Sequence, residues 1–122
     1  MKRRDPRKPT EFQIQCAVVE YLRINALGSV MWLHVPNQQA GGAKRGAYLK
    51  RMGVMPGAAD LLLLRKDDTP IMLWLEIKAP GQRPTKRQQE FADLVRSFGC
   101  EYWWADSVEL AIDLLKKYGW CR

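Results

Sequence analysis

Two apolar segments joined by a short polar turn constrain the fold of this chain most strongly. Residues 58–65 and 71–78 are rich in Leu, Ile and Trp, which is typical of buried strands. The polar turn between them, residues 66–70, predicts a hairpin. The second segment ends in Glu-Ile-Lys. Because side chains alternate faces along a strand, Glu76 and Lys78 are expected on the same face.

Asp60 stands at the start of the first of these segments. If the two strands pair, its carboxylate comes close to that of Glu76, and the two can share a divalent cation. A small site of oxygen ligands suits Mg²⁺ or Mn²⁺. Simpler interpretations are also open at this point. Glu76 and Lys78 could form a solvated ion pair worth about 0–1 kcal/mol, and Asp60 could be an ordinary turn residue.

The N-terminal part of the chain predicts a helix, a strand and a long connection. The helix begins at Thr10, where Thr10 and Gln13 match a capping box, and it ends at Gly28. A short strand follows at residues 30–35, and residues 37–56 form the connection. The apolar stripe that turns this first helix toward the core consists of Ile14, Val18, Tyr21 and Leu22.

The C-terminal part predicts a second helix, a strand and a last helix. Thr85 and Gln88 form another capping-box pattern, and Gly99 ends that helix. A strand at residues 101–104 precedes a helix capped by Asp106. The apolar face of the second helix is expected to contain Phe91, Leu94, Val95 and Phe98. The order αβ(loop)ββαβα predicts an α/β fold, in which a central mixed β-sheet is flanked by helices.

The composition indicates a basic protein with a polyanionic partner. Lys and Arg number 20 against 13 Asp and Glu, giving a net charge of +7, and such a balance favours nucleic acid. No apolar run reaches the roughly 18 residues of a transmembrane helix, so we expect a cytoplasmic protein with no membrane contact. Three widely spaced cysteines form no zinc or disulfide pattern. Cys16 and Cys100 are expected to be buried, and Cys121 to be exposed.

Taken together in chain order, these features resemble the VRR-NUC domain, a family of the PD-(D/E)xK nuclease superfamily that includes stand-alone phage and bacterial proteins. The resemblance covers almost the whole chain, and implies a restriction-endonuclease-like core. It divides the chain into a basic disordered arm at 1–9, a nuclease domain at 10–118 and a C-terminal tail at 119–122. The matching pieces are Glu11 with Gln15, His34-x-Pro36-Asn37, Arg51-Met52-Gly53-Val54-x-x-Gly57, Asp60, Trp74-x-Glu76-Ile77-Lys78 and Gly81-x-x-x-Thr85-x-x-Gln88.

The resemblance also implies roles for individual residues. Asp60 and Glu76 would hold the metal ion, with further ligands from the Ile77 backbone carbonyl and Glu11. Lys78 would lie near the attacking water and the scissile phosphate. One departure is Ala59, where the family usually has proline; proline supplies no metal ligand, so this leaves the ligand set intact. Two alternatives remain: Glu11 could serve only as a favourable charge at a helix N-terminus, and Gln88, implied near the site, could serve only as a cap.

The function implied is a Mg²⁺- or Mn²⁺-dependent DNA endonuclease without a small-molecule cofactor. Structure-selective cleavage of branched DNA such as Holliday junctions, in replication, recombination or repair, fits a small chain with no base-reading module. We expect a homodimer in a bacterial or phage-infected cell. The alternatives are a non-catalytic nucleic-acid-binding module and an RNA endonuclease. The expected DNA contacts are His34, Asn37, Lys44, Arg45, Lys50, Arg51, Arg83, Lys86 and Arg87.

Overall fold

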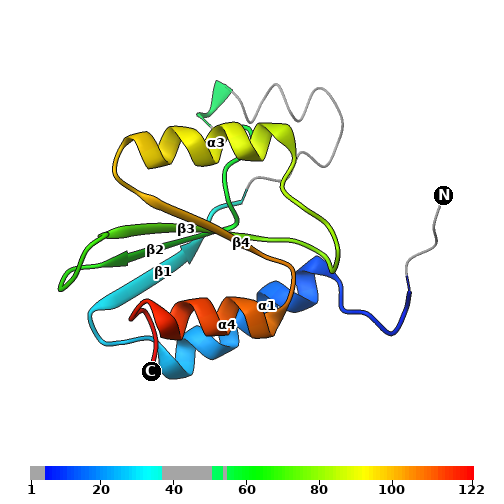
Figure 1. Cartoon of the computed structure of the whole chain (residues 1–122), viewed down its shortest axis with the longest axis horizontal. Coiled ribbons are helices and arrows are strands. Elements are labelled where there is room, and N and C mark those ends of the chain that lie inside the picture. The colour runs from blue at the N-terminus through cyan, green and yellow to red at the C-terminus, as the bar shows by residue number, and fades with distance from the viewer. Residues whose placement is uncertain (1–4, 37–50, 54) are drawn as a thin grey trace.

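The structure, a computed structural model, describes residues 5–36, 51–53 and 55–122. The described residues form three layers, with a four-stranded sheet between helix α3 on one face and helices α1 and α4 on the other (Figure 1). This is the expected mixed sheet flanked by helices. The elements are α1 (Glu11–Asn25), β1 (Val30–His34), β2 (Leu61–Arg65), β3 (Met72–Ile77), α3 (Lys86–Ser97), β4 (Glu101–Ala105) and α4 (Val108–Lys117).

The sheet has the strand order β1-β2-β3-β4 and is mixed. β1 pairs antiparallel with β2, and β2 pairs antiparallel with β3, so the expected hairpin is confirmed. β3 and β4 run parallel, with Glu76 beside Trp104 in the register. A parallel pair needs a crossover connection, and α3 supplies it. The C-terminal end of β3 and the start of β2 therefore meet at one end of the sheet.

The helix boundaries follow local capping chemistry. Both predicted capping boxes are present, at Thr10 for α1 and at Thr85 for α3. Two predicted boundaries are wrong. α1 ends at Asn25, before Gly28, because the backbone is already extended at Ala26. The N-cap of α4 is Ser107 and not Asp106, since the Ser107 hydroxyl accepts the Leu110 N–H.

The alternation of side chains along β3 divides the core into two parts. Leu73, Leu75 and Ile77 are fully buried against α1 and α4. Trp74 packs on the opposite face with Phe91 of α3, at 5.0 Å between ring centroids. Glu76 has the same strand parity as Trp74, so it faces α3 as well.

Helix α3 buries less of its apolar face than expected. Phe91 and Val95 are buried, but Leu94 is 44% and Phe98 79% exposed. Both line an apolar groove of about 570 Å³, together with Met52 of the segment before β2 and other apolar residues. The predicted apolar stripe is therefore correct in composition, and half of it forms a surface.

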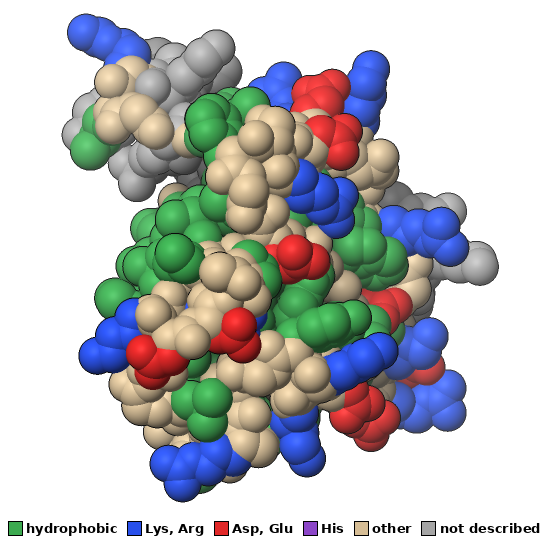
Figure 2. Space-filling view, turned by 60° about the vertical axis from the view of Figure 1, so that its left-hand side comes forward, with side chains coloured by type: hydrophobic (Ala, Val, Ile, Leu, Met, Phe, Trp, Pro, Cys, Tyr) green, Lys and Arg blue, Asp and Glu red, His purple; other side chains and the backbone are tan. Residues whose placement is uncertain are grey.

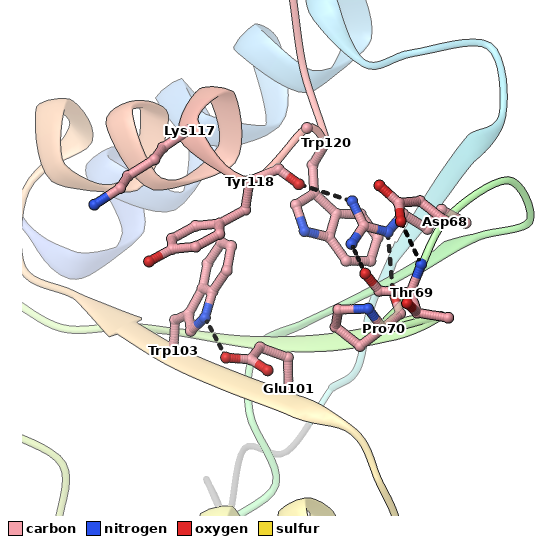
Figure 3. A pocket seen from close by; sticks show the side chains of 10 residues that line it. Asp68, Thr69, Pro70, Glu101, Trp103, Lys117, Tyr118 and Trp120 are labelled. Carbon is pink, nitrogen blue, oxygen red and sulfur yellow. Dashed lines mark hydrogen bonds between the residues drawn. The ribbon is translucent and has the colours of Figure 1, made fainter.

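A buried arginine joins the β2–β3 hairpin to the C-terminus. Arg65 is 6% exposed and donates hydrogen bonds to the carbonyl oxygens of Thr69, Pro70 and Tyr118 at 2.8–2.9 Å. Its guanidinium lies 4.1 Å from the ring centroid of Trp120, which is fully buried. These residues line a pocket at the hairpin end of the sheet, which is shown in Figure 3. Because its donors are used internally, Arg65 does not belong to a phosphate-binding surface.

The expected cysteine environments are wrong. Cys16 is exposed, Cys100 half-buried and Cys121 buried. Cys121 is buried because the chain end returns to the domain, where it forms a β-bridge with Ala26. The segment after α4 thus completes the core on the sheet face that is covered by α1 and α4.

One face of the molecule carries mixed charges. Figure 2 shows the face that is seen when the left-hand side of Figure 1 is turned forward. On it, Lys and Arg side chains lie scattered among Asp and Glu side chains and exposed apolar groups. In the described part of the chain, no helix is long and apolar enough to cross a membrane.

Candidate metal centre

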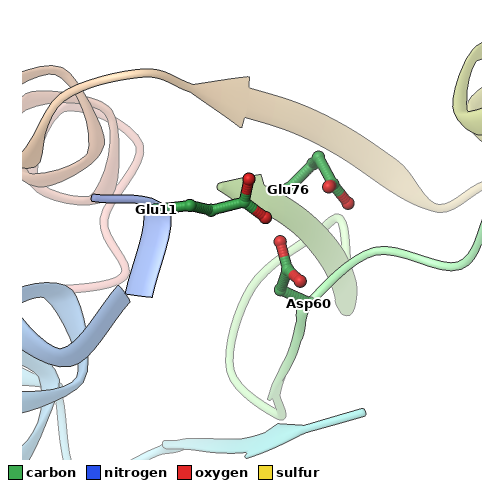
Figure 4. A group of neighbouring side chains, drawn as sticks. All are labelled: Glu11, Asp60 and Glu76. Atoms are coloured by element: carbon green, nitrogen blue, oxygen red, sulfur yellow. The ribbon is translucent and has the colours of Figure 1, made fainter. Parts of the chain in front are cut away.

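Three carboxylates converge where β2 begins and β3 ends. Glu11 comes from the first turn of α1, Asp60 from the residue before β2, and Glu76 from β3 (Figure 4). One carboxylate oxygen from each lies within 4.8 Å of the others. Residues separated by up to 65 positions in the chain thus form one cluster of hard oxygen donors, which is the ligand type preferred by Mg²⁺ and Mn²⁺.

Backbone N–H groups fix both the side chain and the main chain of Asp60. Its Oδ2 accepts the Ile77 N–H at 2.8 Å, which joins the carboxylate to the end of β3. Its own carbonyl oxygen accepts the Val35 N–H at 2.8 Å, next to β1. Ala59 before it is fully buried. The position of Asp60 is therefore set by three strands, and proline before it is not required for this arrangement.

Glu76 is buried in a way that calls for a positive partner. Only 2% of the residue is exposed, and its Oε2 has no hydrogen-bond partner among the described residues. Burial, followed by the nearby charge of Asp60, raises the pKa of Glu76 to about 9. The pKa of Glu11 is raised by the same two causes in the same order. A buried oxygen without a partner, amid carboxylates that repel one another, fits a cation-binding site.

Lys78 is the cation that the structure brings to this cluster. It is 8% exposed and lies on the same strand face as Glu76. Its charge opposes the rise in the pKa of Glu76. Both residues are buried, and no ion pair within 4 Å joins them in the described chain. The interpretation as a solvated surface pair is therefore wrong.

Gln88 connects these two residues and also caps α3. Its Nε2 donates to Glu76 Oε1 at 2.9 Å, and its Oε1 accepts from Lys78 Nζ at 3.2 Å. The same Oε1 accepts the Thr85 N–H at 2.8 Å, which is half of the capping box. One conformation of Gln88 thus caps α3 and contacts both Glu76 and Lys78.

His34 lies beside the carboxylate cluster and contacts the backbone of Asp60. Its Nδ1 is 2.9 Å from the Asp60 carbonyl oxygen and 3.0 Å from Gln15 Nε2. A protonated Nδ1 donates to the Asp60 carbonyl oxygen, whereas an unprotonated Nδ1 accepts from Gln15 Nε2, so the tautomer of the ring selects between these two contacts. His34 therefore connects α1, which carries Glu11, to the residue that starts β2. Residue identity alone did not reveal this connection.

The structure describes Ile77 and only some of the predicted DNA contacts. Ile77 has a buried side chain, as expected, and offers its N–H to Asp60; a metal bond from its carbonyl stays a prediction. The predicted DNA contacts Asn37, Lys44, Arg45 and Lys50 lie outside the described residues. The remaining basic ones, all exposed, are Arg51, Arg83, Lys86 and Arg87.

Comparisons with known proteins identify the architecture. No protein-family model matches the sequence, and no curated protein matches it. A solved structure described as a VRR_NUC domain protein has a TM-score of 0.75 and 23% identity, covering 91% of this chain and 88% of that chain. Another, described as a VRR_NUC domain, has a TM-score of 0.59 and 18% identity, covering 90% of this chain and 99% of that chain.

The chain has the VRR_NUC fold. The fold expected from the sequence resemblance is thus confirmed across nine-tenths of the chain. Within this VRR_NUC fold, β2 and β3 bring Asp60, Glu76 and Lys78 together, and the helices α1 and α3 add Glu11 and Gln88.

Proposed function

We propose that this protein is a metal-dependent nuclease that hydrolyses phosphodiester bonds in DNA. The observation that carries the proposal is the convergence of Glu11, Asp60 and Glu76 within 4.8 Å, next to the buried ammonium of Lys78. Acidic ligands beside one buried lysine suit the stabilisation of a phosphate undergoing attack by water. The similarity to structures named VRR_NUC supports the same conclusion.

The three carboxylates would hold Mg²⁺ or Mn²⁺, with the Ile77 carbonyl as a further proposed ligand. The bound ion would supply Lewis-acid chemistry at the phosphate and at the attacking water. Asp60 is suited to this role because its backbone and its Oδ2 are both fixed by hydrogen bonds. Glu76 is suited because its Oε2 has no competing protein partner in the described chain.

Lys78 would stabilise the negative charge that develops on the phosphate during hydrolysis. An ammonium has three N–H donors, and the hydrogen bond from Lys78 Nζ to Gln88 Oε1 uses one of them. Its charge is screened little because the residue is buried. Gln88 would hold this ammonium at a constant distance from Glu76.

Branched DNA is the proposed substrate class, with a role in replication, recombination or repair in the cytoplasm of a bacterial or phage-infected cell. The exposed basic residues Arg83, Lys86 and Arg87 lie in the loop before α3 and in its first turn, which also contains Gln88. They can contact the phosphates that flank the metal site. Such contacts read the path of the backbone and not the bases, which supports selectivity for DNA structure.

A homodimer forms part of the proposal, because a two-fold symmetric junction matches a two-fold dimer. The apolar groove beside Phe98 offers a surface for it. Sedimentation of Phe98→Ser would test this, with Phe12→Ser as the matched control, since these phenylalanines are 79% and 75% exposed. A dimer that dissociates only in the Phe98 variant is expected, and a monomeric native protein would contradict the proposal.

The decisive experiment is a cleavage assay on labelled single-stranded, duplex, flap and four-way-junction DNA, with Mg²⁺, Mn²⁺ or EDTA. Lys78→Met is compared with Lys66→Met, which removes an exposed lysine from the hairpin turn at the opposite end of β2. Metal-dependent cleavage should be lost only in the Lys78 variant, with circular dichroism showing that both variants fold. Cleavage of RNA alone would favour an RNA endonuclease. Binding without cleavage would favour a non-catalytic module.

A further inference from the structure

Another cavity lies between α3 and β4, next to the loop that precedes α3. Its volume is about 310 Å³, which is at the lower end of the range for small-ligand sites. Its polar and aromatic lining consists of two guanidinium groups, an amide, a carboxylate and two aromatic rings. These belong to Arg83, Arg96, Gln89, Asp93, Tyr102 and Trp104.

The sheet register places this cavity directly beside the metal centre. Trp104 of β4 is the parallel partner of Glu76 of β3, and neighbouring strands lie about 4.8 Å apart. Trp104 packs on the α3 side of the sheet, the side that Glu76 also faces. A group bound against Trp104 therefore lies one strand away from the carboxylate cluster.

The two arginines, Arg83 and Arg96, make the cavity suited to binding an anion. Arg96 donates to the Tyr102 carbonyl oxygen at 3.0 Å, and its guanidinium lies 5.5 Å from the centroid of the Tyr102 ring. These contacts hold the Arg96 side chain in place. A guanidinium has five N–H donors, and the hydrogen bond to Tyr102 uses one of them. Arg83 is exposed at the rim. With Asp93 as the one carboxylate among the lining residues, the formal charge of the lining is +1, from two cations and one anion.

Tyr102 lies on the inner side of the cavity and is almost fully buried. Only 2% of the residue is exposed, and its hydroxyl has no hydrogen-bond partner among the described residues. Trp104, which is half-buried, provides an aromatic surface at the same site.

We propose that this cavity is a subsite for one unpaired nucleotide, adjacent to the phosphate at the metal centre. The base packs on Trp104, while Arg83 and Arg96 bind its phosphate. A paired base is stacked within a duplex and cannot enter a cavity of about 310 Å³, so the nucleotide must be unpaired. The inference rests on the proposed nuclease function, and it narrows the substrate to strands with an unpaired nucleotide beside the cleavage site.

Binding measured without metal tests the subsite separately from cleavage. Fluorescence anisotropy in EDTA would compare a short single-stranded oligothymidine, the corresponding oligouridine and a blunt duplex, using the full chain. Trp104→Leu should weaken single-strand binding about tenfold or more, as expected for the loss of one base–aromatic stack. Trp104→Phe should restore most of the affinity. Arg83→Gln should weaken it and lower the salt dependence by about one phosphate contact.

Lys66→Gln is the matched control for Arg83→Gln, because it removes one exposed positive charge at the far end of the sheet. Native affinity in this control supports the subsite. Equal losses in both charge variants, unchanged binding in Trp104→Leu, or equal affinity for the blunt duplex and the single strand would each overturn it. If the variants lose single-strand binding but the native protein cuts nothing with Mn²⁺, the subsite stands and the nuclease proposal fails. Tighter binding of oligouridine would assign the subsite to an RNA strand.

Discussion

The side-chain amide of Gln88 donates a hydrogen bond to Glu76 Oε1 at 2.9 Å and links helix α3 to strand β3. Its oxygen meanwhile accepts from both Lys78 Nζ and the Thr85 backbone N–H. One residue therefore stabilises the start of a helix and links a carboxylate to an ammonium at the edge of the carboxylate cluster.

Comparing Gln88→Ala with Thr85→Ala separates these two roles. Each substitution removes half of the capping box, which should cost about 1 kcal/mol of the free energy of unfolding, measured with urea. Gln88→Ala should cost about 1–3 kcal/mol more, because it also leaves the buried Glu76 and Lys78 without this partner. Only Gln88→Ala should also lower cleavage or Mn²⁺ affinity, by about tenfold to a hundredfold, as is typical for residues that orient metal ligands. Equal losses of activity in the two variants would show that Gln88 acts only as a cap.

The carboxylate cluster should make stability depend on divalent metal. An ion that binds only the folded state at a hundred times its Kd adds about 2.7 kcal/mol, so Mn²⁺ should raise the Tm of the native protein but not of Asp60→Asn. In EDTA at pH 7, Glu76→Gln should be more stable than the native protein by roughly 1 to 3 kcal/mol. The pKa of Glu76 is raised to about 9 in the folded state, so folding at pH 7 must protonate this carboxyl, and a neutral amide avoids that cost. Differential scanning calorimetry measures both effects.

Glu90→Gln is the control for the Glu76 substitution, since Glu90 is an exposed acid of α3. Glu90→Gln should have the same Tm as the native protein, both in EDTA and in Mn²⁺. A native protein whose Tm does not respond to Mn²⁺ or Mg²⁺ would argue against a metal centre at Glu11, Asp60 and Glu76.

His34 should act on the metal centre through the Asp60 backbone. His34→Ala removes the contact to the Asp60 carbonyl oxygen at 2.9 Å and should weaken Mn²⁺ binding about tenfold, measured by titration calorimetry. Met31→Ala, at a 54% exposed position of the same strand, should not. Weaker DNA binding with unchanged Mn²⁺ affinity would instead support the DNA contact predicted from the sequence.

The three thiols should differ in their rates of alkylation. Burial raises the pKa of Cys121 to about 11, so at pH 8 only about one thiol in a thousand is ionised there. Because the thiolate is the nucleophile, Cys121 should react slowly in the folded protein and faster as the pH rises toward its pKa. Exposed Cys16 should react first. Mass spectrometry of iodoacetamide-treated protein, with a urea-unfolded control, measures this order; rapid labelling of folded Cys121 would contradict its burial.

Local sequence patterns determined much of this protein. The period of two along a strand was enough to place Glu76 and Lys78 on one face, and the adjacent hairpin was enough to bring Asp60 toward them. Both capping boxes were predictable because a cap involves only residues within one turn. Such contacts depend on the order of neighbouring residues and not on how distant elements pack.

Only the tertiary structure decided which distant groups meet. It brings Glu11 of α1 and Gln88 of α3 to the same carboxylate, and the parallel pairing of β3 with β4 places Trp104 beside it. It also turns Arg65 inward against Trp120, where its guanidinium donates to backbone carbonyl oxygens. The physical reason is that hydrophobic patterning specifies which face of an element is buried, whereas the element packed against that face depends on how the whole core closes.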